Sequence, residues 1–288
     1  MQSRSLARGA LRRAREAGRL AVARVDPHAR IGWPDERPDH VERLLTGAGI
    51  PVRRWPLPAA GFAEYLERAV YPEGYHGSPS GRRRSFYEKA LEHFVSLELA
   101  SPAAGEVLVD VASNGGPFIG IASALHGVGC FEQDLRFPAG THGSRIGGDA
   151  AHMTVEPGFA DVMTLHCSYD HFEGTSDVGF AREAARVMRP GGRTVIVPLY
   201  LSDTFGAKVD PRLRLPGLRL DEGMLRFWIP GLGVRFSRFY DPERLKSRVL
   251  EPAAGAGLSW EVVRITGVAG AVADGYCHFG LVLRKPAQ

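Results

Sequence analysis

Short, nearly continuous apolar runs alternate with amphipathic segments over the last two thirds of the chain. The apolar runs predict strands at 106–112, 127–134, 144–149, 160–166 and 193–201. Between them, "FIGIASALHG" and residues 178–188 space their apolar side chains at three and four, which predicts helices. The same alternation resumes after residue 240 with "DPERLKSRVL", "SWEVVRI" and "CHFGLVLRK". Strands that alternate with helices indicate βαβ units, and hence a largely parallel sheet covered on both faces.

Two segments break this rhythm. Residues 1–100 are mainly helical in pattern, with amphipathic stretches at 39–50, 61–70 and 85–100, and are expected to form an N-terminal helical extension or cap. Residues 203–240 are rich in Pro, Gly, Arg and Phe and follow the fifth strand of the core, which spans 101–288. Because parallel sheets bind ligands at the carboxyl ends of their strands, this insert is expected to be a substrate-side insert or lid. A subdomain that only packs on the core is the alternative.

The positive charge of the chain is concentrated at its beginning. The net charge is +4, from 36 basic and 32 acidic residues, yet residues 1–25 hold seven Arg and a single acid, Glu16. The rest of the chain is therefore slightly acidic, which excludes a basic groove through the core. The arm is expected to be a solvated or dimer-packing helix, which leaves a homodimer open. An RNA-binding arm is the alternative, and nucleic acid is not the expected partner.

Several classes of protein are excluded by what the sequence lacks. The longest apolar runs, such as "TVIVPLYL", are far shorter than the ~20 residues of a membrane span. The chain has three widely spaced cysteines, Cys130, Cys167 and Cys277, and no CxxC motif. This pattern suggests neither a disulfide framework nor a zinc site. Asp161, His166 and Asp170 do not have a convincing ligand spacing, so no metal is predicted. The expected location is the cytoplasm.

Acidic residues end three successive predicted strands. Asp110 ends the first and precedes the tight turn "VASNGG", Asp134 ends the second, and Asp149 ends the third. Carboxylates at the carboxyl edge of a parallel sheet suit a cationic, nucleoside-like ligand and suit a pyrophosphate poorly. Glu132 is the alternative to Asp134, since both lie near the strand end. A nicotinamide dehydrogenase is disfavoured because "ASNGGP" does not supply the G-x-G-x-x-G fingerprint.

Five motifs in order resemble those of class I S-adenosylmethionine-dependent methyltransferases. They are "VLVDVASNGG", "FEQDL", "GGDAAHM", "FADVMTLHCSYDHF" and "ARVMRPGG". The resemblance covers residues 105–201 closely and 240–285 loosely. It implies an α/β fold, a Rossmann-like doubly wound sheet of about seven strands whose last strand is antiparallel, and S-adenosylmethionine as cofactor.

The resemblance also implies a set of cofactor-binding residues. Asp110 and the turn after it would lie near the methionine end, Asp134 on the ribose, and Asp149 with Ala150 beside the adenine. The full set is Asp110, Ala112, Asn114, Gly115, Gly116, Asp134, Asp149 and Ala150. The family carries Gly at the third, fifth and seventh positions counted from its Asp, where this chain has Ala112, Asn114 and Gly116. The glycine motif is therefore degraded at two of its positions.

Histidines after the fourth strand are candidates for a general base. Methyl transfer is an in-line displacement, and an oxygen acceptor of high pKa needs a base near neutrality, which is most often His. His171, next to Asp170, and His166 are the two candidate catalytic residues, and packing of either histidine is the alternative. Tyr87 and His93 could close over the cofactor from the preceding helix. Arg82, Arg83 and Arg84 are expected to form a solvated turn.

The sequence thus predicts an enzyme that transfers a methyl group to a small-molecule acceptor, at oxygen, on a sugar or natural-product-like compound. An RNA methyltransferase that uses the basic arm is one alternative. A non-catalytic methyltransferase-like binding protein, which lost turnover through the degraded turn, is the other.

Overall fold

The computed structural model describes residues 28–31, 33–77, 84–210, 218, 220–229, 231–273 and 275–287. The arginine-rich arm at 1–25, Arg82 and Arg83 lie outside the described residues, as does part of the insert. Within the described ranges, none of the helices combines the length and the apolar content that a bilayer span requires.

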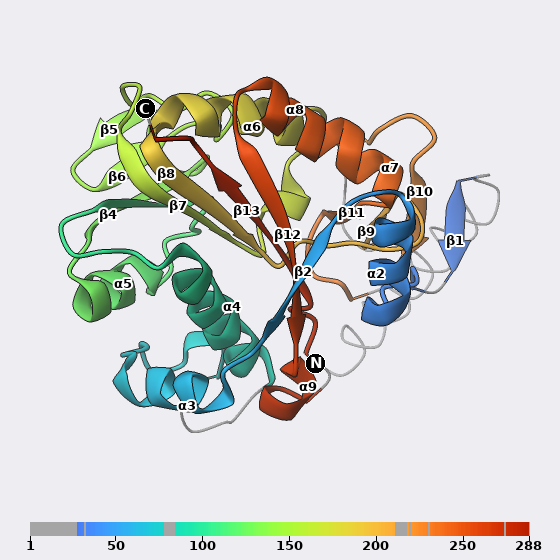
Figure 1. Ribbon diagram of the computed structural model, residues 1–288, viewed down its shortest axis with the longest axis horizontal. Helices are drawn as coiled ribbons and strands as arrows, with labels where there is room; N and C mark the ends of the chain where they lie inside the picture. Colours follow the sequence, from blue (N-terminus) through green and yellow to red (C-terminus); the bar gives the residue numbers. More distant parts are fainter. Residues whose placement is uncertain are drawn as a thin grey trace, which may run out of the picture.

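A large, mostly parallel sheet forms the centre of the molecule (Figure 1). Its nine strands are, in spatial order, β2 (Val52–Pro56), β12 (Ser259–Thr266), β13 (Phe279–Arg284), β8 (Met188–Val197), β7 (Ala160–His166), β3 (Val107–Val111), β4 (Gly129–Asp134), β6 (Arg145–Gly147) and β5 (Gly140–His142). The last strand, β13, is antiparallel to both of its neighbours, which confirms that prediction. The fold class is therefore the doubly wound α/β fold that the alternating pattern predicts.

The predicted number of about seven strands is too low, because one additional strand extends each edge of the sheet. β2 comes from the segment expected to be helical and pairs in parallel with β12. Its charged and aromatic side chains do not alternate with apolar ones, so only the neighbouring strand defines it as β structure. β5 is a three-residue strand that pairs antiparallel with β6, and it is too short to leave a periodic pattern.

Helices cover both faces of the sheet, as the alternating pattern requires. On one face lie α4 (Arg84–Ala100), α5 (Phe118–His126), α3 (Ala59–Arg68) and α9 (Val268–Ala271), and on the other α2 (Pro38–Gly47), α6 (Ser176–Val187) and α8 (Glu251–Gly255). Successive side chains of β3 enter opposite cores: Leu108 packs under α4 and α5, whereas Val109 and Val111 pack on the α6 side. This division follows from the two-residue period of a strand.

The described part of the insert forms a second, smaller sheet together with a short strand from the N-terminal segment. Its order is β1 (Ala29–Ile31), β10 (Leu225–Trp228), β9 (Gly206–Val209) and β11 (Phe236–Phe239). Arg238 of β11 is fully buried and pairs with Asp177 of α6 and with Asp221. Arg248 contacts the same two carboxylates from the helical turn η3 (Lys246–Leu250). Buried ion pairs therefore connect the insert to the core.

The strand order reverses beside β3. β4 lies on one side of it and β7 on the other, and both run parallel to it. The connections that follow β3 and β7 therefore run to opposite sides, and a crevice lies between them at the carboxyl ends of the two strands. This is where open parallel sheets bind ligands.

Candidate functional site

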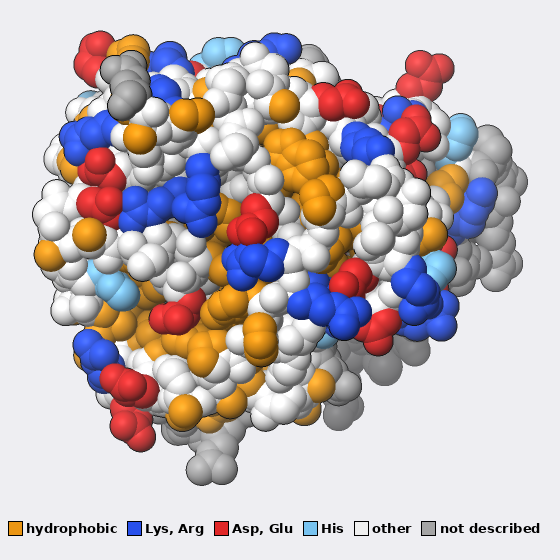
Figure 2. Space-filling model, in the orientation of Figure 1, with side chains coloured by type: hydrophobic (Ala, Val, Ile, Leu, Met, Phe, Trp, Pro, Cys, Tyr) orange, Lys and Arg blue, Asp and Glu red, His pale blue; other side chains and the backbone are white. Residues whose placement is uncertain are grey.

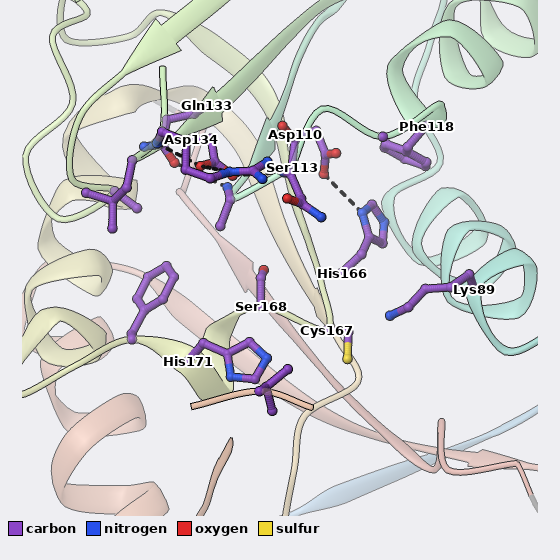
Figure 3. A pocket seen from close by; sticks show the side chains of 18 of the residues that line it. Lys89, Asp110, Ser113, Phe118, Gln133, Asp134, His166, Cys167, Ser168 and His171 are labelled. Carbon is purple, nitrogen blue, oxygen red and sulfur yellow. Dashed lines mark hydrogen bonds and ion pairs between the residues drawn. The ribbon is translucent and has the colours of Figure 1, made fainter. Parts of the chain in front are cut away.

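A cavity of about 890 Å³ opens at the carboxyl ends of β3, β4 and β7 (Figure 3). Its size lies within the ~300–1,000 Å³ range of small-molecule sites. Nearly all of the site residues expected from the sequence line this cavity. They are Asp110, Ala112, Asn114, Gly116, Asp134, Asp149, Ala150, His166 and His171. Gly115 belongs to the same turn but does not line the cavity.

The turn after β3 has a left-handed backbone at its degraded positions. Ala112 has φ 53° and Asn114 has φ 58°, next to Gly115 at 68°. Asn adopts this conformation more readily than Ala, which has no side chain that can stabilise it. The backbone of the turn thus keeps its glycine-like path although two glycines are absent. At Gly116, a Cβ atom would lie 3.4 Å from the Ser113 carbonyl oxygen, an ordinary van der Waals contact.

Gln133, which the sequence analysis did not single out, holds the turn from the next strand. Its Oε1 accepts a hydrogen bond from the Ala112 backbone N–H at 3.2 Å, and its Nε2 donates to the Gly148 carbonyl at 2.5 Å. The side chain is buried and lines the cavity. Gln133 therefore fixes the first and third strand-end loops relative to each other.

The two acids at the end of β4 have different surroundings. Asp134 faces the cavity and accepts hydrogen bonds from the backbone N–H groups of Asn114 and Arg136, each at 2.9 Å. Glu132 does not line the cavity, and its carboxylate pairs with Arg145 at 2.9 Å. The geometry therefore favours Asp134 over Glu132 as a ligand-binding residue, because Asp134 has the oxygen atoms that a ligand can reach.

Asp149 and Ala150 line the cavity after β6. The Asp149 carboxylate accepts a hydrogen bond from the Ala151 N–H at 2.9 Å, which closes a local turn. Leu135 and Val234, which are among the exposed large apolar side chains of the described residues, lie at the same cavity. They give it an apolar rim.

Asp110 and His166 form a buried pair between β3 and β7. His166 Nδ1 lies 3.0 Å from Asp110 Oδ1, and Thr164 Oγ1 donates to the same oxygen at 3.1 Å. The His166 ring also packs on Phe118, with ring centroids 4.2 Å apart. His166 Nε2 is buried and has no hydrogen-bond partner within the described part of the chain. This nitrogen therefore needs a partner that a ligand can supply.

His93 of α4 lies beside this pair. Its ring centroid is 4.9 Å from that of His166, and its Nδ1 is 2.9 Å from the Tyr71 hydroxyl. Burial, together with the neighbouring His166 and Lys89, lowers the pKa of His93 well below its ordinary value. His93 is therefore uncharged. Of the two residues expected to close over a cofactor, His93 and Tyr87, His93 is the one that lines the cavity.

His171 approaches the cavity from the short helix η2 (Tyr169–His171). Its Nδ1 lies 2.6 Å from the Phe236 carbonyl oxygen and 3.6 Å from a carboxylate oxygen of the buried Asp170. A carbonyl oxygen only accepts, so Nδ1 carries the proton of the neutral ring. Nε2 is then the nitrogen that can accept a proton from a ligand. The insert strand β11 thus fixes the tautomer of a core histidine.

Lys89 and Cys167 form a wall of the cavity that sequence reasoning missed. Lys89 Nζ donates to Glu92 Oε2 at 2.8 Å. Cys167 has φ 48°, and its Sγ lies 3.1 Å from the Tyr200 hydroxyl. Burial raises the pKa of the Cys167 thiol to about 12, so it is not a thiolate nucleophile. Along the helix, Lys89 looks like an ordinary polar position, and only the placement of α4 beside the cavity shows its role.

Other chemically suggestive residues serve structural contacts. Asp161 accepts from the Val107 N–H at 2.8 Å and pairs with Arg189 at 2.6 Å, as expected for a residue that opens a strand. Within the described ranges, one group of three potential metal ligands lies close together, Asp35, His40 and Asp203. Arg37 pairs with Asp35 there, and none of the three lines the cavity.

No family model matches the chain, and no curated protein matches it. Among solved structures, it is similar to the Burkholderia thailandensis 1,6-didemethyltoxoflavin-N1-methyltransferase, with 14% identity over 78% of this chain and 87% of that one and a TM-score of 0.45. It is also similar to a Mesorhizobium loti S-adenosylmethionine-dependent methyltransferase, with 14% identity over 67% and 98% of the chains and a TM-score of 0.44. It is similar as well to the Haemonchus contortus phosphoethanolamine N-methyltransferase 2, with 14% identity over 86% of this chain and 60% of that one and a TM-score of 0.43.

Methyltransferases recur among the solved structures to which this chain is similar. At such identities and TM-scores, the similarity says nothing about the acceptor of this chain. Its chemistry has to come from the cavity.

Proposed function

We propose that the protein transfers a methyl group from S-adenosylmethionine to a hydroxyl oxygen of a small molecule. The cavity supports the cofactor assignment in three ways. Asp110, Asp134 and Asp149 lie at the ends of β3, β4 and in the loop after β6, around one cavity. The left-handed turn at 112–115 brings the backbone close to it. The buried, unpartnered Nε2 of His166 offers an acceptor to a ligand that carries N–H or O–H donors.

The residues present fit the cofactor by their chemistry. Asp134 would accept from ribose hydroxyls, the turn from Asp110 to Gly116 would contact the methionine end, and Asp149 with Ala150 would lie beside the adenine. When bound, S-adenosylmethionine supplies an electrophilic methyl group on a positively charged sulfur. Because His93 is uncharged, it would not repel the positively charged sulfur of a bound cofactor, as an imidazolium would.

The observation that carries the proposal of an oxygen acceptor is the fixed tautomer of His171. The Phe236 carbonyl holds Nδ1, so Nε2 can take the proton of an acceptor hydroxyl as the oxygen attacks. His171 Nε2 would thus receive the hydroxyl proton as the acceptor oxygen takes up the methyl group that the cofactor would supply. His166, whose Nδ1 is occupied by Asp110, would act on the cofactor side of the cavity.

The remaining residues align the reactants and keep water out. Phe118 and Phe172 line the cavity with apolar surface, and Val234 of the insert contributes to its rim. Exclusion of water matters because hydrolysis competes with transfer. The insert at 203–240 would accordingly be a substrate-side cover, and residues of the segment before 100, such as Lys89, complete the acceptor side.

An RNA acceptor finds less support in the described part of the chain. Figure 2 shows positively and negatively charged side chains interleaved over one face, where an RNA-binding face would present a continuous positive band. A steep dependence of substrate binding on salt concentration would favour RNA, and a weak one a small molecule.

Calorimetry with S-adenosylhomocysteine tests the cofactor, and methyl transfer from labelled S-adenosylmethionine to a panel of hydroxylated compounds tests the reaction. We expect saturable binding by the full chain, and transfer that His171→Gln lowers by ~10²–10⁴-fold in kcat with the cofactor affinity unchanged. Transfer to nitrogen alone, or full activity of the His171 variant, would contradict the oxygen acceptor. Failure to bind S-adenosylhomocysteine would favour the non-catalytic alternative.

A further inference from the structure

Lys89 brings a buried positive charge to the acceptor side of the cavity. It lies in the first turns of α4, and its side chain is 19% exposed. In Figure 3 it extends from α4 toward Cys167, on the opposite side of His166 from Asp110. Asp134, Asp149 and Ala150 line the other end of the same cavity. The ammonium group is thus placed away from the residues assigned to the nucleoside.

The hydrogen bond of Lys89 to Glu92 leaves N–H donors for a ligand. An ammonium group has three N–H donors. One goes to Glu92 Oε2 at 2.8 Å. The other oxygen of Glu92 accepts from the Tyr276 hydroxyl at 2.8 Å, so both oxygens of this carboxylate have a partner. Because Lys89 lines the cavity, its remaining N–H groups are available to a ligand there.

Lys89 keeps its charge in this position. Burial by itself would lower its pKa, but the neighbouring Glu92 carboxylate outweighs burial and raises the pKa above its ordinary value. Its charge contributes to the lowered pKa values of His76 and His93, both of which line the cavity and for both of which burial is the main cause. The acceptor side therefore presents one permanent cation, held by Glu92, beside the uncharged His93.

A buried cation with an unused donor binds an anionic oxygen best. Hydrogen bonds between two charged groups are roughly twice as strong as those between neutral ones. A buried polar group without a partner also costs free energy, which a matching ligand restores. Arg136, the other permanent cation at the cavity, lies beside Asp134 and pairs with it at 3.2 Å.

We propose that the cavity contains an anion subsite at Lys89, which holds a carboxylate or phosphate group of the methyl acceptor while its hydroxyl faces His171. The substrate class is therefore a hydroxyl-bearing small anion. This inference rests on the proposed function for the role of the anion, but the subsite itself can be tested by binding alone.

The chain offers its own controls, because it has only four lysines. Lys208 is held by Glu36, Lys246 by the Ala48 carbonyl, and Lys285 by the carbonyls of Ala185 and Met188. With ¹⁵N-labelled lysine, the side-chain ammonium signals of the full chain can be followed by NMR, and Lys89→Met assigns the signal that disappears. The probes are 4-hydroxybenzoate, 4-hydroxyphenyl phosphate and, as the neutral match, 4-hydroxybenzamide, each with S-adenosylhomocysteine present and absent.

We expect one or both anions to shift the Lys89 signal in a saturable way and to leave the other three lysine signals in place. The amide should bind at least tenfold more weakly, and Lys89→Met should weaken binding of the anion at least tenfold, with Lys89→Arg between the two. Preference for the benzoate or for the phosphate distinguishes the two sources of negative charge. Calorimetry with S-adenosylhomocysteine verifies that the variants are folded and bind the cofactor.

The proposal is overturned if neither anion moves the Lys89 signal at millimolar concentration, if the amide binds as tightly as the anions, or if Lys89→Met binds them unchanged. Loss of S-adenosylhomocysteine binding in the unaltered chain is a separate result. It would contradict the proposed function and leave the anion titration of Lys89 interpretable.

Discussion

His166 Nδ1 lies 3.0 Å from Asp110 Oδ1, and this pair joins the ends of two neighbouring parallel strands. The carboxylate accepts a hydrogen bond from Nδ1–H, which leaves the buried Nε2 as the ring nitrogen that can meet a ligand. His171 is fixed in the same tautomer by a backbone carbonyl from the insert. The two histidines that the sequence offers as alternatives are thus held by different elements and are available to different parts of one cavity.

The role of Asp134 can be measured through the cofactor product. Asp134→Ala removes a carboxylate that faces the cavity and supports the turn through the Asn114 N–H. We expect its affinity for S-adenosylhomocysteine to fall roughly tenfold or more, because a hydrogen bond to a charged group contributes about 1.5–3 kcal/mol. Calorimetry provides the measurement. Glu132→Gln is the matched control, since Glu132 pairs with Arg145 outside the cavity. An unaffected Asp134 variant beside a weakened Glu132 variant would reverse the assignment.

Ala112 is the position where the degraded glycine motif costs stability. Its left-handed φ of 53° is unfavourable by about 1–2 kcal/mol for a residue with a Cβ. Ala112→Gly removes that strain, offset by about 0.5–1 kcal/mol of extra entropy in the unfolded chain. We expect a net gain of ~0.5 kcal/mol in the free energy of unfolding, measured in urea. The control Ala254→Gly, on an exposed position of α8, should lose about 1 kcal/mol. A loss at both positions would show that Ala112 is not strained.

Asp177 holds the buried ion network between the insert and the core. It is fully buried and contacts Arg248 at 2.7 Å, Arg238 at 3.4 Å and the Tyr240 hydroxyl at 2.9 Å. Asp177→Asn leaves buried arginines short of a negative charge, so we expect a loss of about 3–5 kcal/mol in the free energy of unfolding. Glu243→Gln, at an exposed ion pair with Arg244, should change it by less than about 0.5 kcal/mol. Similar small effects at both sites would mean that the network is solvated.

Acid should destabilise the protein through its buried histidines. Burial, with a smaller contribution from Arg264, lowers the pKa of His278 to about 4, from an ordinary value of 6.5. Between these values the unfolded chain binds more protons than the folded one, so the free energy of unfolding rises with pH. The stabilisation is complete above pH 6.5 and is lost as the pH falls toward 4; His93 acts in the same direction.

His278→Gln should therefore reduce the slope of the free energy of unfolding against pH between pH 6.5 and 4, by up to the amount that corresponds to one bound proton. Urea unfolding at a series of pH values measures the slope. His142→Gln, at an exposed position, is expected to leave it unchanged. A slope that is the same in both variants would show that His278 is hydrated in the folded protein.

The insert at 203–240 should respond to ligands unevenly. Val234 lines the cavity, whereas Arg238, four residues later in β11, is anchored in the core. We expect hydrogen exchange around residues 231–235 to slow at least severalfold with S-adenosylhomocysteine and an acceptor bound, while β11 stays protected in both states. Equal protection of the whole segment with and without ligands would indicate a static insert. The acceptor pocket would then be sought under residues 61–100.

Much of the fold follows from local patterns in the sequence. The run "ADVMTLH" predicts β7 to the residue, because buried parallel strands need continuous apolar side chains on both faces. Asp110, Asp134 and Asp149 could be assigned to one edge without coordinates, since the carboxyl ends of parallel strands meet there. The chain order of strands and helices thus determined the fold class and brought nearly all of the expected site residues to one cavity.

Tertiary structure alone decided which groups meet. Nothing in the sequence near "RWP" predicts that β2 extends the sheet, because its partner β12 lies about 200 residues later and supplies the hydrogen bonds. The preference for Asp134 over Glu132 comes from the cavity, which Asp134 lines, whereas Glu132 pairs with Arg145 outside it. Likewise, Lys89 belongs to a helix whose pattern indicates only packing, and Phe236 fixes His171 through a backbone carbonyl that any residue would provide. Contacts between segments that are distant in the sequence arise only when the chain packs. Where the partner is a backbone carbonyl, any residue can provide it, so the residue type at that position carries no signal.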